Sequence, residues 1–239
     1  MKRIFKEPFF TLTFCLIITL GFSQSKEIKI KFLGNCGLHL TDGTTNIYTD
    51  FPYKSGAHGY MEFNDYELDS IKKNSIFIFT HKHSDHYSKK NLKKNLKKVI
   101  KEKGGKKYGV SNIPKLKELN KTINDFEIKE FKTKHKVFGI NFRHYSYLIT
   151  WHGKRIYLSG DTTNPETIGK VTNIDLAFIP YWLYENAKNQ NIEIDADEIG
   201  IYHLHPAEIK SAEKFFKDKE NEYPLTEQSK IITIELQTE

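Results

Sequence analysis

The sequence predicts an α/β fold in which two β-sheets pack face to face and helices cover the outside. Strand patterns in the first half of the chain lead into a helix pattern, and the second half repeats that order. Residues 25–239 contain no internal repeat and no linker rich in proline or serine. Their length suits one domain with a sizeable core, so we expect a single domain over 25–239.

The first residues, 1–24, have the pattern of a secretory signal peptide. Basic residues precede an apolar run from Phe9 to Phe22, and small or polar residues at 21–24 suit a cleavage site. The apolar run is short for a membrane span, although an uncleaved anchor is the alternative. We expect cleavage after Gln24, a periplasmic or secreted protein and no lasting membrane anchor. Cys36 would then be the single cysteine, so no disulfide could form within the chain.

Three strand patterns precede the first chemically informative motif. In 27–34, apolar residues alternate with lysines, which predicts a half-buried strand. In 38–50, an Asp-Gly pair separates two short strands, as in a hairpin. The continuous apolar run 75–79 predicts a strand buried on both faces.

The lysine-rich segment 88–105 predicts an amphipathic helix that ends at a Gly-Gly pair. Leu92, Leu96, Val99 and Ile100 repeat at helical spacing. The lysines could form a patch that binds nucleic acid, but a solvated helix face is the simpler interpretation, because an exported protein rarely meets nucleic acid. The net charge of +7 is modest. We therefore expect a small-molecule substrate and no nucleic-acid partner.

The second half of the chain supplies further strands and a helix. Strands are predicted over 126–133, twice within 144–161 around a His-Gly turn, over 174–180 and over 230–236. A helix is predicted over 206–219, with Pro206 in its first turn. The residues expected on its apolar face are Ile209, Ala212, Phe215 and Phe216.

The buried strand at 75–79 runs straight into a cluster of metal-ligand side chains: His81, His83, Asp85 and His86. In extended backbone, positions i and i+2 project to the same side, so the first two imidazoles can bind one ion. The other two side chains fall in the turn that follows. Imidazole and carboxylate groups suit zinc, and Mn²⁺ or iron would accept them too.

Four ligands from one turn cannot satisfy two ions, since a catalytic zinc takes roughly three protein ligands and keeps one open position. Further ligands are available in three later segments. His135 or His144 is a candidate in the first of them, and His203 or His205 in the last. Between them, Asp161 ends a strand in the sequence Ser-Gly-Asp-Thr.

This order of motifs resembles the metallo-β-lactamase superfamily over essentially all of 25–239. It consists of His-x-His-x-Asp-His after a buried strand, a later histidine, Gly-Asp-Thr after a strand and a late histidine. The opening stretch 31–50 also resembles the first hairpins of that family, with Asp50 at the place of a structural aspartate. The resemblance implies an αββα four-layer sandwich of two mixed β-sheets flanked by helices.

The resemblance also implies a metal-dependent hydrolase with two ions, most simply Zn²⁺. Its metal ligands would be His81, His83 and His135 for a first ion, Asp85, His86 and His203 for a second, and Asp161 as a bridge between them. His135 is preferred to His144 because the third histidine of the family precedes the hairpin strand. His203 is preferred to His205 because it directly follows an apolar run.

Two adjacent cations lower the pKa of a shared water, and the resulting bridging hydroxide can attack a carbonyl carbon or a phosphorus. Asp85 is the predicted catalytic residue, because it would orient that hydroxide as well as hold an ion. No Gly-x-Ser-x-Gly nucleophile motif competes with this chemistry, and Cys36, in a glycine-flanked turn, is expected to be structural. The stretch 153–162 resembles the lactonase and phosphodiesterase-like branch, so the expected substrate is a small ester, lactone or phosphodiester.

Other functions of the same fold stay open at this point. One is an iron-dependent redox enzyme, and another is a nuclease or phosphodiesterase that acts on nucleic acid. A binding module that lost turnover is disfavoured, because a decayed site would be expected to lack a ligand. His58, in a glycine-rich loop, and Tyr181 and Trp182, which follow a strand, are candidates for lining a substrate pocket.

Overall fold

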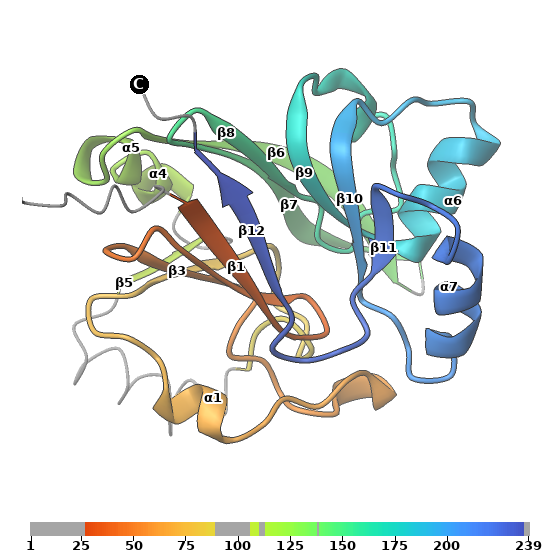
Figure 1. Cartoon of the computed structure of the whole chain (residues 1–239), viewed down its shortest axis with the longest axis horizontal. Coiled ribbons are helices and arrows are strands. Elements are labelled where there is room, and N and C mark those ends of the chain that lie inside the picture. The colour runs from red at the N-terminus through yellow and green to blue at the C-terminus, as the bar shows by residue number, and fades with distance from the viewer. Residues whose placement is uncertain (1–26, 89–105, 110–112, 138, 237–239) are drawn as a thin grey trace, which may run out of the picture.

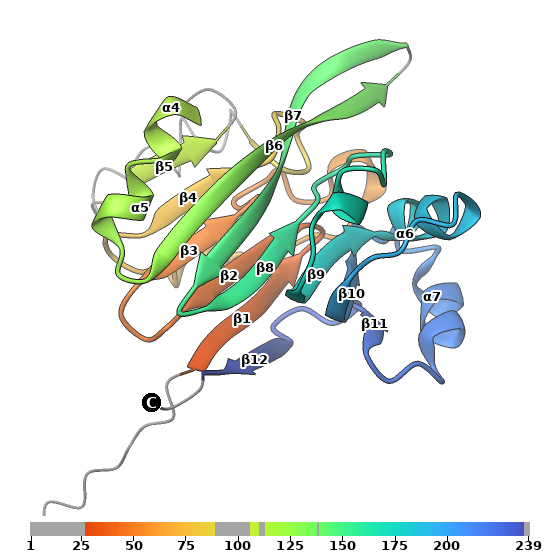
Figure 2. The same ribbon diagram turned by 90° about the horizontal axis from the view of Figure 1, so that it is seen from above.

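Two six-stranded sheets form the centre of the protein (Figures 1 and 2). The computed structural model describes residues 27–88, 106–109, 113–137 and 139–236. The strand orders are β12-β1-β2-β3-β4-β5 in the first sheet and β11-β10-β9-β8-β7-β6 in the second.

The first sheet is built from the N-terminal half of the chain and the last strand. Its strands are β1 (Glu27–Gly34), β2 (Gly37–Thr41), β3 (Asn46–Thr49), β4 (Ile76–Phe79), β5 (Lys106–Gly109) and β12 (Ile231–Glu235). Strands β12, β1, β2 and β3 pair in antiparallel fashion, whereas β3, β4 and β5 are parallel.

The second sheet is also mixed. Its strands are β6 (Phe126–Val137), β7 (Ile140–Trp151), β8 (Lys154–Leu158), β9 (Ile174–Pro180), β10 (Ala196–Tyr202) and β11 (Glu222–Pro224). Strands β6, β7 and β8 form an antiparallel meander, and β8 to β11 are parallel.

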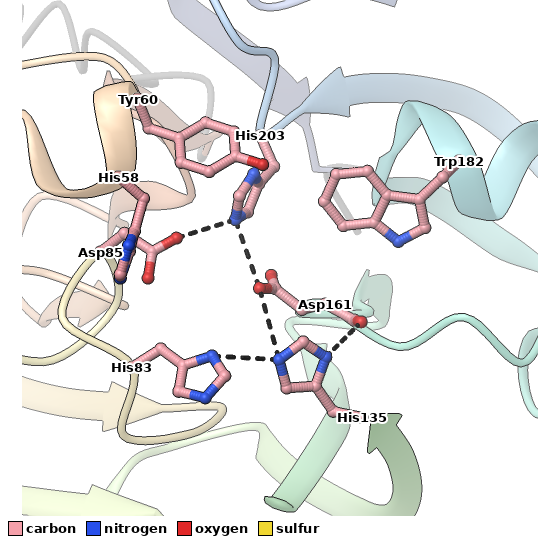
Figure 3. A pocket seen from close by; sticks show the side chains of 8 residues that line it. All are labelled: His58, Tyr60, His83, Asp85, His135, Asp161, Trp182 and His203. Atoms are coloured by element: carbon pink, nitrogen blue, oxygen red, sulfur yellow. Dashed lines mark hydrogen bonds and ion pairs between the residues drawn. The ribbon is translucent and has the colours of Figure 1, made fainter. Parts of the chain in front are cut away.

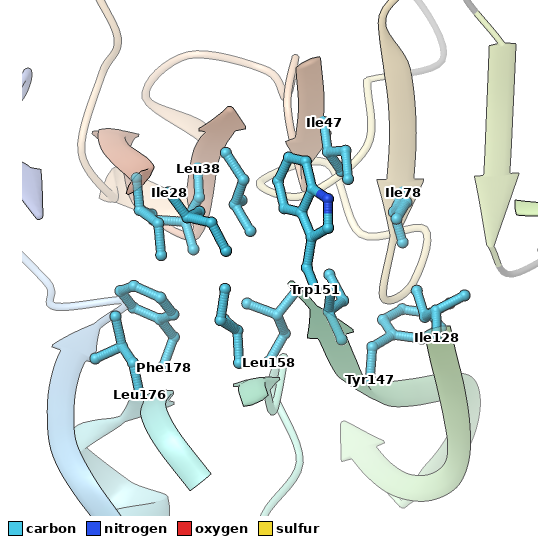
Figure 4. Close-up of a cluster of buried hydrophobic side chains, with 14 of the residues drawn as sticks. Ile28, Leu38, Ile47, Ile78, Ile128, Tyr147, Trp151, Leu158, Leu176 and Phe178 are labelled. Atoms are coloured by element: carbon cyan, nitrogen blue, oxygen red, sulfur yellow. The ribbon is translucent and has the colours of Figure 1, made fainter. Parts of the chain in front are cut away.

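The main core fills the space between the two sheets (Figure 4). Strand β4 shows how period-2 alternation builds it: Ile76 and Ile78 join the core between the sheets, whereas Phe77 and Phe79 join an aromatic cluster on the opposite face. Trp151 is fully buried and is the largest side chain in the core. The continuous apolar run was therefore correctly predicted as a strand covered on both sides.

Helices cover the outer faces and close one edge. Helices α6 (Tyr181–Asn189) and α7 (Ile209–Phe216) pack against the outer face of the second sheet. The short helix α1 (Tyr66–Asp69) lies below the first sheet in Figure 1. The remaining short helices are α4 (Ile113–Leu116), α5 (Leu119–Thr122), η1 (Ala57–Gly59) and η3 (Ile168–Lys170). The predicted pair of mixed sheets with flanking helices is confirmed.

All strands predicted from the sequence are present, and the helix predicted over 206–219 is shorter than expected. It begins at Ile209, because Pro206 and its neighbours form a separate turn. Phe216 is buried as predicted, but Phe215 is 42% exposed, so its placement on the packed face was wrong. The predicted signal peptide and the predicted lysine-rich helix beyond residue 88 lie outside the described residues. No helix in the described part of the chain is long and apolar enough to span a membrane.

The parallel strands of both sheets end at one common edge of the sandwich. Asp50 follows β3 and His81 follows β4 in the first sheet, whereas Asp161 follows β8 and His203 follows β10 in the second. The carboxyl ends of parallel strands are where open α/β sheets bind ligands. This topology brings the predicted site residues together.

Candidate metal centre

The turn after β4 is held in shape by its own backbone and by Asp50. The amides of His86 and Tyr87 both donate to the carbonyl of His83, at 3.1 and 2.7 Å. Asp50 accepts from the Thr80 amide and hydroxyl, both at 2.7 Å, and lies 2.8 Å from His86 Nδ1. Asp50 is buried, so this carboxylate fixes the turn from beneath, as expected for a structural aspartate.

The same hydrogen bonds determine which histidine nitrogens face the site. The Asp50 carboxylate can only accept, so His86 donates from Nδ1 and turns Nε2 towards the cavity. Thr80 Oγ1 already donates to Asp50, so it accepts from His81 Nδ1 at 3.1 Å. His81 Nε2 thereby also faces the site. Such orientation of a ligand by its second ring nitrogen is typical of metal-binding histidines.

His135 lies near the end of the long strand β6, on the second sheet, and faces the histidines of the first. Its Nδ1 donates to the Asp161 carbonyl at 3.0 Å, which leaves Nε2 without that proton. Nε2 lies 3.0 Å from His83 Nδ1, across the gap between the sheets (Figure 3). Two such nitrogens in close contact are arranged to share a cation.

Asp161 lies between all the other ligand candidates. Gly160 precedes it with φ of +59°, and a Cβ at Gly160 would overlap His144 Nε2, so only glycine fits this turn. One carboxylate oxygen, Oδ1, lies 2.9 Å from His86 Nε2. The other, Oδ2, lies 3.3 Å from His203 Nε2 and 3.5 Å from His81 Nε2. This carboxylate therefore reaches both groups of histidines, as a bridging ligand would.

His203 enters the site from the end of β10 in a left-handed turn, with φ of 56°. Its amide donates to the Asn35 carbonyl at 3.1 Å, which holds the turn against the β1–β2 connection. Its Nε2 lies 3.1 Å from Asp85 Oδ2 and 3.1 Å from His86 Nε2. His203 is buried and belongs to the cluster.

The two competing histidines occupy different positions. His144 is fully buried behind Asp161: its Nε2 accepts from the Asp161 amide at 2.8 Å, and its Nδ1 lies 2.6 Å from Thr133 Oγ1. Both ring nitrogens are thus occupied by the protein. The ring of His205 is instead near the pocket rim, where its Nδ1 accepts from the Ala207 amide at 3.2 Å. His135 and His203 belong to the two groups of closely spaced ligand atoms, whereas His144 and His205 belong to neither.

The pKa shifts of the site residues indicate that the site would stabilise bound cations. Burial alone would raise the pKa of Asp161, but His203, His86 and His81 outweigh it and hold that pKa well below its usual range. Burial lowers the pKa of His203, yet Asp161 and Asp85 together raise it to about 9. Burial lowers the pKa of His81 well below its usual range. Carboxylates therefore dominate one side of the cluster, and neutral imidazoles dominate the other.

Two groups of ligand atoms are close enough to hold one ion each. In each group the ligand atoms lie within 4.8 Å of one another. One group consists of His81, His83, His135 and Asp161, and the other consists of Cys36, His86, Asp161 and His203. Asp161 belongs to both. Cys36 was expected to be structural, and its presence here was not predicted.

Divalent cations fit these residues. Several buried polar atoms of the cluster have no hydrogen-bond partner among the described residues, and they are His81 Nε2, Asp85 Oδ1 and His203 Nδ1. Buried polar atoms are rarely left in this state, because each costs about 1–3 kcal/mol. Of these atoms, His81 Nε2 lies 3.5 Å from Asp161 Oδ2. The donor set of imidazole, carboxylate and thiol suits zinc and related metals.

The cluster forms the floor of a pocket of about 330 Å³ (Figure 3). Tyr60 and Trp182 form aromatic walls, with ring centroids 4.2 and 5.0 Å from that of His203. His58 also lines the pocket, as the sequence suggested, and its Nε2 lies 3.0 Å from Ser84 Oγ. Tyr181 does not line it, because its ring packs against Phe215 and Phe216 instead. No sequence pattern singled out Tyr60.

Comparisons with known proteins agree with this geometry. Residues 29–207 match the family described as the Beta-lactamase superfamily domain. The chain belongs to the metallo-β-lactamase superfamily. The family match and the hydrolases among the structures of the same fold support a metal-dependent hydrolase, and the two ligand groups imply a divalent metal cofactor. No curated protein sequence matches it.

Solved structures share the fold at low sequence identity. Igni18, a metallo hydrolase of Ignicoccus hospitalis, aligns with a TM-score of 0.64 at 17% identity over 88% of this chain and 100% of its own. An isothiocyanate hydrolase from Delia radicum gut bacteria aligns at 0.54 and 12%, over 87% and 99%. CmlA, a diiron β-hydroxylase of Streptomyces venezuelae, aligns at 0.54 and 14%, over 88% of this chain and 54% of CmlA.

Proposed function

We propose that the protein is an exported hydrolase with two zinc ions, which cleaves an ester, lactone or phosphodiester bond in a small molecule. The observation that carries this proposal is Asp161, a single buried carboxylate shared by two groups of ligand atoms at the floor of an open pocket. Two divalent cations bound there would supply a hydroxide nucleophile near neutral pH and stabilise negative charge on the substrate oxygen.

The protein side chains hold and orient the reacting groups. His83 and His135 lie on one side of the pocket, and Asp85 and His203 lie on the other, so a substrate that enters the pocket would lie between these two pairs. Asp85 has one carboxylate oxygen 3.1 Å from His203 and one with no partner among the described residues. That second oxygen is buried, and with cations bound it would accept a proton from the water that they hold.

The walls of the pocket favour an acyl substrate over a phosphodiester. Tyr60 and Trp182 supply flat apolar surfaces, and His58 supplies a polar group at the rim. The lining contains neither lysine nor arginine among the residues that the structure describes. A phosphate would therefore depend on the cations alone for charge compensation, whereas the uncharged carbonyl of a lactone or ester needs no further cation.

The test is metal analysis of the purified protein, followed by kinetics on that same preparation. We expect about two zinc ions per chain and hydrolysis of members of a panel of lactones, carboxylic esters, thioesters and phosphodiesters, with the acyl compounds preferred. Replacing His58 with alanine should raise KM more than it lowers kcat, because the residue lines the pocket and belongs to neither group of ligand atoms. Fully zinc-loaded protein that hydrolyses no compound of the panel would contradict the proposal.

A second candidate is an iron-dependent redox enzyme, and the likeness to the diiron β-hydroxylase CmlA favours it. Imidazole and carboxylate ligands also accept iron, so the ligand set does not decide between the two. Iron, not zinc, in protein purified without added metal, together with oxygen consumption, would favour this alternative.

Export and the absence of a nucleic-acid partner are part of the proposal. Both depend on the pattern of residues 1–24, which begins basic, continues apolar and ends in small or polar residues. Mass spectrometry of the cellular protein should find an N-terminus near Ser25. An intact Met1 would contradict export, and salt-dependent binding to RNA would favour a nuclease instead.

A further inference from the structure

Cys36 lies in the tight connection between β1 and β2. The preceding residues, Gly34 and Asn35, both have positive φ, at 118° and 48°. The register between the two strands shifts at this point, between Phe32 and Gly34. The resulting bend directs the Cys36 side chain into the protein, where the residue is only 1% exposed.

The connection between β1 and β2 makes hydrogen bonds to two segments that carry predicted ligands. Asn35 Nδ2 donates to the Asp85 carbonyl at 3.0 Å, and the Asn35 carbonyl accepts from the His203 amide at 3.1 Å. The turn at Asn35 and Cys36 therefore joins the segment that carries Asp85 to the segment that carries His203. Its position is fixed by the same contacts that fix two predicted ligands.

The thiol faces the ligands of the second ion. Cys36 Sγ lies within 4.8 Å of ligand atoms of His86, Asp161 and His203, and all four residues are buried. Cys36 also belongs to the main apolar core, so its side chain lies at the border between that core and the ligand atoms.

Cys36 and Asp85 differ in their access to the pocket. Asp85 lines the pocket, whereas Cys36 does not, so the sulfur lies on the closed side, beneath the floor. A ligand on the closed side leaves the pocket side free for water and substrate. It also leaves Asp85 free to act on the reacting water.

We propose that Cys36 is a ligand of the second metal ion, so that this position is held by sulfur, nitrogen and oxygen, and not by nitrogen and oxygen alone. This inference rests on the proposed two-ion function and adds a ligand that the sequence did not predict. On metal binding the thiol releases its proton to solvent and the sulfur binds the ion as a thiolate. A sulfur ligand makes this position prefer Zn²⁺, Co²⁺ or Cd²⁺ to Mn²⁺ or Mg²⁺.

The test uses cobalt, which reports sulfur ligation by a charge-transfer band in the near ultraviolet. The full chain carries Cys15→Ser, so that Cys36 is the single thiol. After loading with Co²⁺, we expect this band to appear, and we expect it to disappear in the Cys15→Ser/Cys36→Ser variant. Affinity for the second equivalent of Co²⁺ should fall at least about tenfold, the lower end of the effect of losing a supporting group at a metal site.

X-ray absorption of the zinc-loaded Cys15→Ser protein gives an answer even if Cys36→Ser does not fold. We expect a sulfur neighbour at about 2.3 Å from zinc, which is the usual zinc–sulfur distance. A cobalt band that survives in the double variant, or a zinc shell of nitrogen and oxygen only, would overturn the inference. The presence or absence of a sulfur neighbour tests Cys36 as a ligand, whatever the number of bound ions. The number of ions tests the proposed function, because fewer than two ions per chain would count against it.

Discussion

The two sheets contribute to the metal centre in opposite ways. The first sheet supplies four predicted ligands from one turn, residues 81–86, directly after β4. The second sheet supplies three predicted ligands from the ends of three different strands: His135 on β6, Asp161 after β8 and His203 after β10. One half of the site is therefore local in sequence, and the other half exists only when the sheet is formed.

The hydrogen bonds that position the ligands also differ between the two sheets. In the first sheet, Asp50 supports the whole turn through Thr80 and His86. The ligands of the second sheet are held by different contacts: the Asp161 carbonyl accepts from His135, and the Asn35 carbonyl, in the connection between β1 and β2, accepts from the His203 amide. Apart from Asp161, which both groups of ligand atoms share, the ligands of the second sheet come from separate strands and can be tested one at a time.

The largest effect is expected for Asp161→Asn, since Asp161 is the residue that joins the two groups. The amide keeps the shape but removes the charge that both groups share. We expect kcat/KM to fall by at least about a thousandfold, roughly 4 kcal/mol, and bound metal to fall below two ions per chain. Enzyme kinetics and metal analysis of the same preparation measure both.

A matched control is Asp197→Asn, an exposed carboxylate on β10. It removes the same charge from the same sheet, away from the pocket, and both activity and metal content should be unchanged. Wild-type metal content in Asp161→Asn would show that the two groups do not depend on a shared carboxylate.

A second prediction compares the halves directly, through His83 and His135. These residues come from different sheets, yet their ring nitrogens lie 3.0 Å apart and face one ion position. We expect His83→Ala and His135→Ala to lower kcat/KM by similar factors, about a hundredfold or more, and the double variant to be little worse than either. Additive losses would mean that the two histidines serve different ions.

The first-sheet half of the site could be predicted from the sequence more completely than the second-sheet half. The turn after β4 could be identified from spacing alone, because alternation and a buried apolar strand determine where His81 and His83 project. For the second sheet, the prediction had to choose between His135 and His144, which lie on the two paired strands of one hairpin. That choice depends on pairing register and on Gly160, and spacing along the chain does not encode either.

Cys36 and Tyr60 show what such reasoning misses altogether. Cys36 lies in a glycine-flanked turn, and only the positive φ at Gly34 and Asn35 directs it towards the ligands. Tyr60 reaches His203 because η1 folds back over the pocket. Both placements depend on backbone conformations of loops, which hydrophobic periodicity does not report.

A third prediction concerns His144, whose ring supports the second-sheet half of the site. In His144→Ala the Asp161 amide loses its 2.8 Å acceptor and becomes a buried unpaired donor. We expect a loss of about 1–3 kcal/mol in the free energy of unfolding and a fall in metal affinity of about 10- to 100-fold, with two ions still bound at saturation. Chemical denaturation and metal titration measure these effects. Loss of one whole ion at saturation would instead make His144 a ligand.

The smallest effect is expected for His205→Ala. Comparing this variant with His203→Ala shows which of these two neighbouring histidines binds metal. His203 is buried among the carboxylates, with Nε2 3.1 Å from Asp85, whereas His205 accepts only a backbone amide near the rim. We expect His205→Ala to change the free energy of unfolding by less than about 0.5 kcal/mol and to leave two ions bound. His203→Ala, its matched partner, should lose the second ion. If His205→Ala lost that ion and His203→Ala kept it, His205 and not His203 would be the metal ligand.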